Sequence, residues 1–307
     1  MSTFRVLVTG GAGFVGSHLV NSLLKEGHRV VALDNLSTGA IENLPVRRKK
    51  GFLFIKGDIR DNNDVRKALN DVDVVFHMAA IIDVPLSVKK PLIVNDVNVS
   101  GTLKLLEACL KHDVRRFIYA SSCAVYGAPQ YLPIDENHPI IPQSPYGISK
   151  LTSEHFCRIF HEIHGLETIS LRFFNIYGKR QVKGPYSGVI TKFAERLKEK
   201  KSPVIFGDGE QTRDFLHVND AVNACMLALR NKTYVGKIIN IGSGKETTIN
   251  ELVSLLIELS AKTNIKPVYK PPRKGDILRS WANIEKAKKL LGYQPKVDLE
   301  SGLIEFF

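Results

Sequence analysis

The sequence predicts an α/β fold, a Rossmann-type doubly wound parallel sheet followed by a smaller C-terminal α/β lobe. Two observations support this prediction. Short apolar stretches that suit buried strands alternate with helical patterns through the first half of the chain. A glycine-rich turn separates the first of these stretches from the first helical pattern, as in dinucleotide-binding folds.

The expected elements can be placed in chain order. Strands are predicted at 4–8, 29–33, 52–56, 72–77, 116–120 and 167–173, and long helices at 14–26, 92–111 and 145–164. After residue 175, short strands and helices alternate less regularly between glycine turns. We therefore divide the chain into a first domain over 1–175 and a second over 176–307, leaving room for segments of the second to return to the main sheet.

The glycine turn follows the first strand directly. Its glycines fit two spacings, G-x-G-x-x-G with Gly11, Gly13 and Gly16 or G-x-x-G-x-x-G with Gly10, Gly13 and Gly16. A tight turn lets the backbone approach a pyrophosphate, and the N-terminus of the next helix offers unpaired N–H groups to an anion. We expect Phe14 and Val15, which begin that helix, to lie against the same cofactor.

Further candidates follow the C-terminal ends of the next strands, where open α/β sheets gather ligands. Asp34 lies roughly 20 residues after the glycines, where a carboxylate can accept both ribose hydroxyls and repel a 2′-phosphate, which favours NAD over NADP. Asp58 and Ile59 are placed to flank an adenine, and Ala79 leaves room for a cofactor against the backbone. Asn98, within the next helix, could bond across to a strand and is a further candidate cofactor contact; a solvated asparagine is the alternative.

Tyr146 and Lys150 form a Tyr-x-x-x-Lys pair at the start of a predicted helix, so they share one helical face. A phenol with an unperturbed pKa near ~10 is a poor base at neutral pH, and a nearby ammonium lowers that pKa by favouring the phenolate. Such a pair also arises by chance on surfaces. After a dinucleotide fold and the serine-rich strand end at Ser121 and Ser122, it predicts a proton-transfer site.

Composition narrows the classes of partner. The net charge is +12, but the basic residues are dispersed and the one dense run, 47–50, lies in a predicted loop, so nucleic acid is not expected. We find neither a bilayer-spanning apolar run nor a secretory leader, so we expect no membrane partner and a cytoplasmic location. The four cysteines form no Cys-x-x-Cys pair, and no metal site is predicted.

Two arginines in the second half stand near acidic residues. Arg213 and Arg273 are either paired with surface carboxylates or placed to grip a diphosphate, because a guanidinium matches phosphate oxygens bidentately.

Together, and in this order along essentially the whole chain, these motifs resemble the extended short-chain dehydrogenase/reductase family, and within it the UDP-glucose (UDP-galactose) 4-epimerases. The resemblance implies an NAD-dependent isomerase of nucleotide-sugar and galactose metabolism with a C-terminal UDP-sugar-binding lobe. For the cofactor it implies these contacts: the pyrophosphate with Gly10, Gly13 and Gly16, the ribose with Asp34 and Asn35, and the adenine with Asp58 and Ile59. For the substrate it implies contacts to UDP from Asn175, Arg213, Arg273 and Asp276.

The resemblance also implies a mechanism. Tyr146 as phenolate takes the proton of the sugar O4, Ser122 hydrogen-bonds the same oxygen, and the C4 hydride passes to NAD⁺. Lys150 steadies the tyrosinate and the nicotinamide ribose, and the hydride then returns to the other face of the 4-keto sugar. Helices at 92–111 and 145–164 would form a four-helix homodimer interface. Ser280 would line the pocket near the sugar C2, where a small residue leaves room for an N-acetyl group.

The chain departs from the family pattern at the strand end. Ser-Ser-Cys-Ala-Val-Tyr-Gly is one residue shorter than the form common in epimerases, and counting back from Tyr126 gives Ser122 the catalytic role. The acid–base pair of 4,6-dehydratases would stand at Cys123 and Ala124, which argues against dehydration. Another nucleotide-sugar reductase or decarboxylase is the runner-up. A non-catalytic NAD-binding protein is the third reading, and the Ser122, Tyr146 and Lys150 set counts against it.

Overall fold

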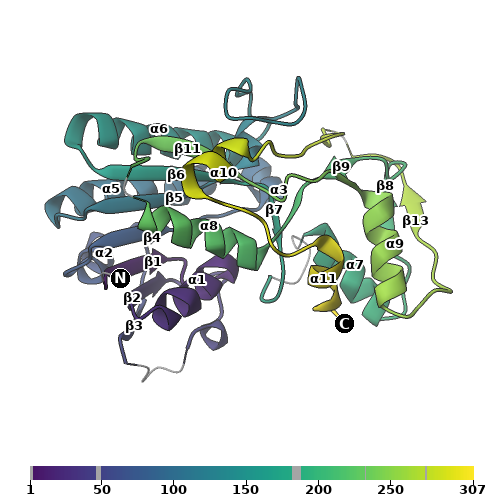
Figure 1. The fold of residues 1–307 in the computed structure, drawn as a ribbon, viewed down its shortest axis with the longest axis horizontal. Helices are drawn as coiled ribbons and strands as arrows, with labels where there is room; N and C mark the ends of the chain where they lie inside the picture. Colours follow the sequence, from purple (N-terminus) through teal and green to yellow (C-terminus); the bar gives the residue numbers. More distant parts are fainter. Residues whose placement is uncertain (1–2, 46–49, 182–187, 232, 274) are drawn as a thin grey trace.

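The computed structural model describes residues 3–45, 50–181, 188–231, 233–273 and 275–307; most of the basic run at 47–50 lies outside them. Within these residues the main sheet contains β1 (Arg5–Thr9), β2 (Arg29–Asp34), β3 (Phe52–Lys56), β4 (Val74–His77), β5 (Arg116–Ser122), β6 (Glu167–Phe173) and β11 (Lys237–Ile241). All neighbours pair in parallel, in the order β11-β6-β5-β4-β1-β2-β3 (Figure 1). The predicted Rossmann-type sheet is confirmed.

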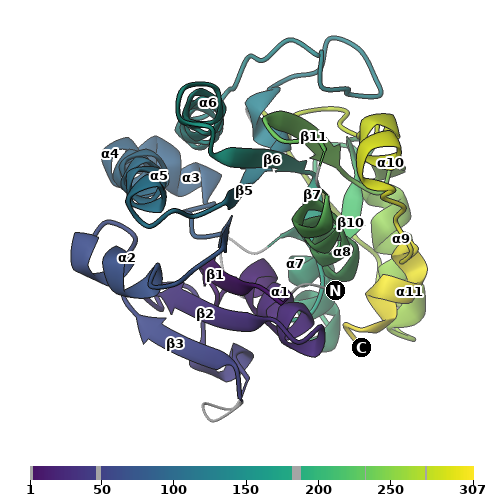
Figure 2. The same ribbon diagram turned by 60° about the vertical axis from the view of Figure 1, so that its left-hand side comes forward.

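Helices cover both faces of this sheet (Figure 2). The apolar core on one face includes α1 (Phe14–Lys25), α8 (Val218–Arg230) and α10 (Glu285–Leu291). The core on the other face includes α2 (Asn62–Ala68), α5 (Gly101–Lys111) and α6 (Pro145–His164). The start of α6 is fixed because the Ser144 hydroxyl accepts the N–H of Gly147 and Pro145 supplies the first helical residue.

The predicted helix over 92–111 is helical but not uniform. It is built from α4 (Pro91–Asn95), a π-helical turn over Asp96–Ser100 and α5, and it follows the short α3 (Val84–Lys89). A single π-turn inside an α-helix often marks a functional site. Here it brings Asn98 into the protein interior, where its exposed fraction is 1%.

The smaller lobe has an apolar core of its own. Its described elements are β7 (Asn175–Tyr177), α7 (Val189–Lys198), β8 (Val204–Phe206), β9 (Thr212–Arg213), β10 (Phe215–His217), β12 (Thr247–Thr248), α9 (Ile249–Leu259), β13 (Val268–Lys270) and α11 (Leu299–Ile304). The strands pair as β10-β7, β12-β9 and β13-β8. Two short 3₁₀ turns, Ile41–Asn43 and Cys123–Val125, complete the described elements.

The chain after residue 175 contributes to both units. Strand β11 returns to the main sheet beside β6, and α8 packs against α1 on one face of that sheet. The division into 1–175 and 176–307 stays a proposal, in which the second part is a lobe interrupted by these returning segments. In the part of the chain that the structure describes, no helix has the length and apolar character needed to cross a bilayer.

Candidate functional site

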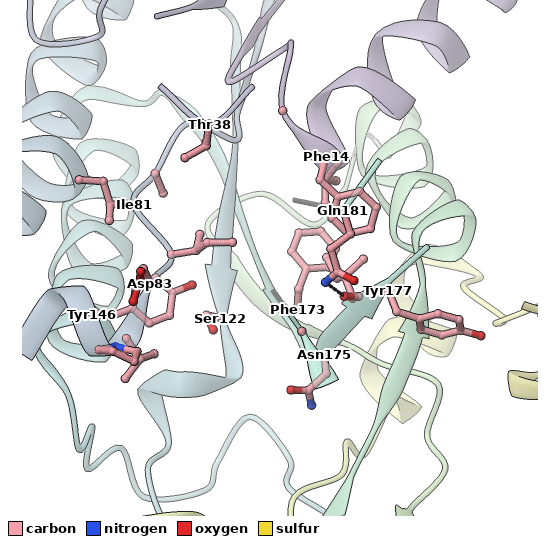
Figure 3. Close-up of a pocket in the computed structure, with 18 of the residues that line it drawn as sticks. Phe14, Thr38, Ile81, Asp83, Ser122, Tyr146, Phe173, Asn175, Tyr177 and Gln181 are labelled. Carbon is pink, nitrogen blue, oxygen red and sulfur yellow. Dashed lines mark hydrogen bonds between the residues drawn. The ribbon is translucent and has the colours of Figure 1, made fainter. Parts of the chain in front are cut away.

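The carboxyl ends of the central strands face the smaller lobe across one continuous cavity of about 1210 Å³ (Figure 3). Predicted site residues from both halves of the chain line this cavity: Gly10, Gly13, Phe14, Val15, Gly16, Asp34, Asn35, Asp58, Ile59, Ala79, Ser122, Tyr146, Lys150, Asn175, Arg213, Arg273 and Asp276. The fold therefore joins the dinucleotide-type site to the arginines of the lobe in a single space.

The structure distinguishes the two glycine spacings. Gly10, Gly13 and Gly16 line the cavity, whereas Gly11 lies against Ala32, with no room for a Cβ. Gly10 has φ +65°, and a Cβ there would stand 2.8 Å from the backbone nitrogen of Ala79. A Cβ on Gly16 would stand 2.1 Å from the carbonyl oxygen of Gly10. The turn is thus closed against itself and against the end of β4, which brings bare backbone to the cavity as a pyrophosphate requires.

A buried histidine ties the glycine turn to the neighbouring strand end. His77, on β4, lies 2.7 Å from the Thr9 hydroxyl through Nδ1 and 2.8 Å from the Thr102 hydroxyl through Nε2. The N–H of Ala79 also donates to the Thr9 hydroxyl, at 3.2 Å. Burial lowers the pKa of His77 to about 3, so the ring is neutral. It connects β1 to α5 through its two hydrogen bonds.

The acidic residue at the end of β2 is fixed toward the cavity. The Asp34 carboxylate accepts the N–H groups of Ala12 at 2.9 Å and Leu36 at 2.8 Å, and each oxygen keeps a lone pair for a further donor. Asn35 donates to Asp58 at 2.9 Å. Hydrogen bonds from Arg60 hold the pKa of Asp58 well below its usual range, although burial opposes them. These residues fit a ribose with two free hydroxyls.

We expect the cofactor-free protein to bind NAD at least tenfold more tightly than NADP, a difference of about 1.4 kcal/mol or more. The reason is that the Asp34 carboxylate would meet a 2′-phosphate as a like charge, while Arg60, already bonded to Asp58 and Asp96, is not free to neutralise it. Calorimetric titration with both dinucleotides measures the ratio, and D34S should reduce it. Tighter binding of NADP by the wild type would contradict the assignment.

Asn98 lies behind the cavity wall rather than on it. Its side chain bonds both backbone groups of Ile81, accepting from N at 2.8 Å and donating to O at 2.9 Å, and donates to the Ser149 hydroxyl at 3.0 Å. Ile81 lines the cavity, and Asn98 is not among the described residues that do. Asn98 therefore supports the wall by satisfying the backbone of a loop, and its direct contact with a cofactor stays a prediction.

Ser122, Tyr146 and Lys150 all line the cavity, and Figure 3 shows Ser122 and Tyr146 there. Ser122 ends β5, and the other two side chains leave the first turns of α6 with exposed fractions of 8% for Tyr146 and 3% for Lys150. The Lys150 ammonium donates to the Ala120 carbonyl at 2.8 Å and stands 5.0 Å from the centre of the Tyr119 ring. Tyr146 and Lys150 thus leave α6 toward the same cavity, as their spacing predicts, and their role in proton transfer stays a prediction.

The electrostatics differ from the expectation that Lys150 lowers the pKa of Tyr146. Burial raises the pKa of Tyr146 to about 12, and hydrogen bonding to Ser122 only partly offsets it. Burial also lowers the pKa of Lys150 to about 7, because the amine loses water and pairs with no carboxylate among the described residues. At neutral pH Tyr146 therefore keeps its proton, and Lys150 is close to equally divided between its neutral and charged forms. The neighbouring Cys123 thiol is inert for the same reason, since burial raises its pKa to about 12.

In the lobe, Arg213 both pairs with a carboxylate and remains at the cavity, so neither of its two predicted roles is excluded. Arg213 donates to Asp276 at 2.6 Å and to the Ile277 carbonyl at 2.7 Å, yet it still lines the cavity. The Arg273 guanidinium stands 3.9 Å from the centre of the Phe206 ring.

Two other predicted substrate residues are placed differently from each other. Asn175 lines the cavity and donates to the Asp214 carbonyl at 3.2 Å. Ser280 is buried, its N–H donates to the Thr212 hydroxyl at 3.3 Å, and it is not among the described lining residues. Ser280 thus lies against β9 rather than on the described cavity wall, and its contact with a substrate stays a prediction.

Sequence reasoning missed several cavity residues. Lys192 and Arg196 stand one turn apart on α7 and line the cavity together with Lys270 of β13. The i, i+4 spacing of Lys192 and Arg196, opposite an apolar face, was the available signal. It did not show which surface α7 would face. Asp83, which caps α3 by accepting the N–H of Leu86 at 2.8 Å, also lines the cavity.

Comparison with known proteins identifies the family to which the chain belongs. The NAD dependent epimerase/dehydratase family matches residues 6–242. A putative UDP-glucose 4-epimerase of Methanocaldococcus jannaschii is 43% identical over 97% of this chain and 95% of its own length. A UDP-N-acetylglucosamine 4-epimerase from Methanobrevibacter ruminantium, solved with UDP-N-acetylmuramic acid, has a TM-score of 0.94 at 39% identity over 100% of this chain and 97% of the other.

A third similar protein was solved with a cofactor. The UDP-glucuronic acid 4-epimerase from Bacillus cereus, in complex with UDP-glucuronic acid and NAD, has a TM-score of 0.91 at 36% identity, covering 98% of both chains. The glycine turn, the Asp34 carboxylate and the continuous cavity of this chain fit the same cofactor. The chain therefore belongs to the NAD dependent epimerase/dehydratase family, as an NAD-using enzyme of the UDP-sugar 4-epimerase type.

Proposed function

We propose that this enzyme interconverts UDP-glucose and UDP-galactose, and also the corresponding N-acetylhexosamine pair, with Tyr146 as the base. The continuous cavity carries the proposal, because it joins Ser122, Tyr146 and Lys150 both to the cofactor residues and to the lobe. Its lobe side has an excess of basic residues, Lys192, Arg196, Arg213, Lys270 and Arg273, over the acidic Glu195, Glu199 and Asp276. Such a surface suits the diphosphate of a nucleotide sugar.

In the proposed mechanism, Tyr146 removes the proton from the sugar O4 while the Ser122 hydroxyl hydrogen-bonds the same oxygen. When bound, NAD⁺ supplies a positive charge and the group that accepts and returns a hydride. Tyr146 returns the proton to O4 after the sugar has presented its other face. The sugar is oxidised only transiently, because the hydride that leaves C4 returns to the same carbon within one turnover.

Lys150 has the second role in this proposal. Its amine is neutral or charged with nearly equal ease at neutral pH, since burial lowers its pKa to about 7. A cation at this position stabilises a tyrosinate one helical turn away. Proton uptake by Lys150 would therefore accompany the loss of the proton from Tyr146, so that the buried pair stays near electrical neutrality.

Incubating the purified enzyme with UDP-galactose and measuring UDP-glucose by chromatography tests the proposal. A reductase would instead consume added NADH, and a decarboxylase would release carbon dioxide from UDP-glucuronate. A binding protein would leave all of these sugars unchanged. If the enzyme converted UDP-glucuronate to UDP-galacturonate but did not turn over the neutral hexoses, the proposed substrate class would be wrong.

Substrate breadth is expected to depend on Ser280. This side chain is buried off the described cavity wall. A tyrosine is too large for that site, and we expect the residues that it displaces to narrow the space for the sugar. S280Y should lower kcat/KM for the N-acetylhexosamine pair by about tenfold or more and spare the plain hexoses. S280A serves as the control and should resemble the wild type. Equal losses for both pairs of sugars, or a wild type inactive on the acetamido sugars, would contradict this role of Ser280.

We also propose a homodimer through the face built from α3, α4 and α6. Leu92 is 83% exposed, and Val88, Ile148 and Ile163 are exposed on the same packed helices. Removing such side chains from water favours association. At micromolar concentration we expect a dimeric mass by light scattering, with L92E shifting it toward the monomer. L278E places the same charge on an exposed leucine of the lobe and should leave the dimer intact; a monomeric wild type would reject the proposal.

A cytoplasmic, reducing compartment is part of the same proposal. It is supported by four cysteines that are all free thiols.

A further inference from the structure

A buried ion pair lies beside the catalytic end of β5. Glu154 of α6 and Arg172 of β6 are each 1% exposed, and the Arg172 Nε donates to Glu154 Oε2 at 3.0 Å while a second nitrogen donates to the other carboxylate oxygen. Neither side chain is among the described residues that line the cavity. The pair therefore has no direct part in binding or proton transfer.

On one side the ion pair connects the two elements that carry the candidate catalytic residues. The Ser121 hydroxyl donates to Glu154 Oε2 at 2.8 Å. Ser121 immediately precedes Ser122 on β5, and Glu154 stands one helical turn after Lys150 on α6. This bond therefore holds the strand that presents Ser122 against the helix that presents Tyr146 and Lys150.

On the other side the ion pair leads toward the lobe. Arg172 donates to the Tyr126 hydroxyl at 2.8 Å, with its guanidinium 4.7 Å from the centre of that ring. Tyr126 donates to Asn240 Oδ1 at 2.6 Å, and the Asn240 amide donates to the Ile134 carbonyl at 3.0 Å.

From Ile134 the contacts continue to the substrate side. The N–H of Ile134 donates to the Trp281 carbonyl at 2.9 Å. The next residue, Ala282, donates its N–H to the Asp214 carboxylate at 3.1 Å, and Asp214 follows Arg213 in the chain. The network therefore spans from the catalytic strand end to the arginine that lines the lobe side of the cavity.

A buried ion pair is a weak source of stability, since desolvation of the two charges offsets most of their attraction. Its fixed geometry has a clearer use, because a reacting group misplaced by about 1 Å loses much of its rate. We propose that Ser121, Glu154 and Arg172 are positioning residues that hold Ser122 in register with Tyr146 and Lys150. They act through the strand end: Glu154 and Arg172 are not among the described residues that line the cavity, and Ser121, which does line it, has its hydroxyl bonded to Glu154.

S121A is the sharpest test, because it breaks the connection to β5 and leaves the ion pair intact. E154Q or R172Q would leave one buried charge without its partner, and such a variant could fail to fold. We expect S121A to lower kcat about tenfold while KM for the nucleotide sugar and the amount of bound NAD stay within twofold of the wild type. The matched control is T168V, which removes another buried hydroxyl bonded between β6 and α6, at Cys157, away from the network.

A crystal structure of S121A gives a readout that does not depend on turnover. The proposal expects the Ser122 hydroxyl to shift from Tyr146 or to occupy several rotamers, whereas T168V should leave it unmoved. An unmoved Ser122, or a loss of kcat in S121A no greater than in T168V, would overturn it. The kinetic arm rests on the proposed function, which wild-type turnover tests separately, so the two can fail independently.

Discussion

Replacement of Tyr146 by phenylalanine is expected to lower kcat by roughly 10²–10⁴-fold, the usual contribution of a positioned general base. The ring keeps its buried packing against the wall of the cavity, so the fold and the bound NAD should be retained. What is lost is the hydroxyl that faces Ser122, which is the group proposed to take the sugar O4 proton. The rate of UDP-galactose conversion and the NAD content after denaturation measure the two effects together.

Y131F makes the same chemical change outside the cavity. The exposed Tyr131 bonds through its hydroxyl only to the half-buried Asp135, at 2.8 Å, among the described residues, so this variant should keep wild-type turnover. Near-normal activity of Y146F would end the assignment of Tyr146 as base. Loss of activity together with loss of NAD would instead indicate a damaged cofactor site, which a structure or a titration with NAD resolves.

The fold and much of the cavity could be predicted from the sequence because they depend on local rules. Strand, glycine turn and helix N-terminus are contiguous in the chain, and the strand bounds differ from the predicted ones by only a few residues. Tyr146 and Lys150 are separated by one helical turn, so their common face follows from helix geometry alone. In such cases sequence distance already fixes spatial distance.

The parts that could not be predicted depend on long-range packing. The placement of Asn98 behind the wall follows from a π-turn, which no periodicity of the 92–111 segment indicates. The cavity role of Lys192 and Arg196 depends on the lobe docking α7 against the sheet ends. The network from Ser121 to Asn240 joins residues up to 119 positions apart, so no spacing in the chain reveals it.

The raised pKa of Tyr146 could not be predicted for the same reason. The sequence gives the identity of Lys150 and its distance along the helix, but not how completely the two groups lose water. Burial dominates both pKa values, raising that of Tyr146 and lowering that of Lys150. The sign of such a shift is decided by solvation as much as by the neighbouring charge.

Replacement of Lys150 by methionine is expected to separate activity from stability. Methionine is unbranched and apolar, so it can fill most of the lysine site. Without the cation that stabilises a tyrosinate, kcat should fall by roughly 10²-fold. Stability of the NAD-free protein at neutral pH should nevertheless rise, because wild-type folding forces a buried amine to release its proton or keep its charge unsolvated. Loss of the bond to the Ala120 carbonyl offsets about 1 kcal/mol of that gain.

The stability advantage of K150M over the wild type should depend on pH, in a direction that follows from the lowered pKa of Lys150. Between about pH 7 and the ordinary lysine pKa of 10.5, the unfolded chain holds a proton that the folded protein has released. The free energy of unfolding of the wild type should therefore rise with pH in this window, by up to about 1.4 kcal/mol per pH unit from this group. K150M lacks the group, so its advantage should be largest near pH 7 and shrink toward pH 9.5. Urea unfolding of both NAD-free proteins at several pH values measures the difference, and parallel pH dependences would show that Lys150 is charged and well solvated in the folded protein.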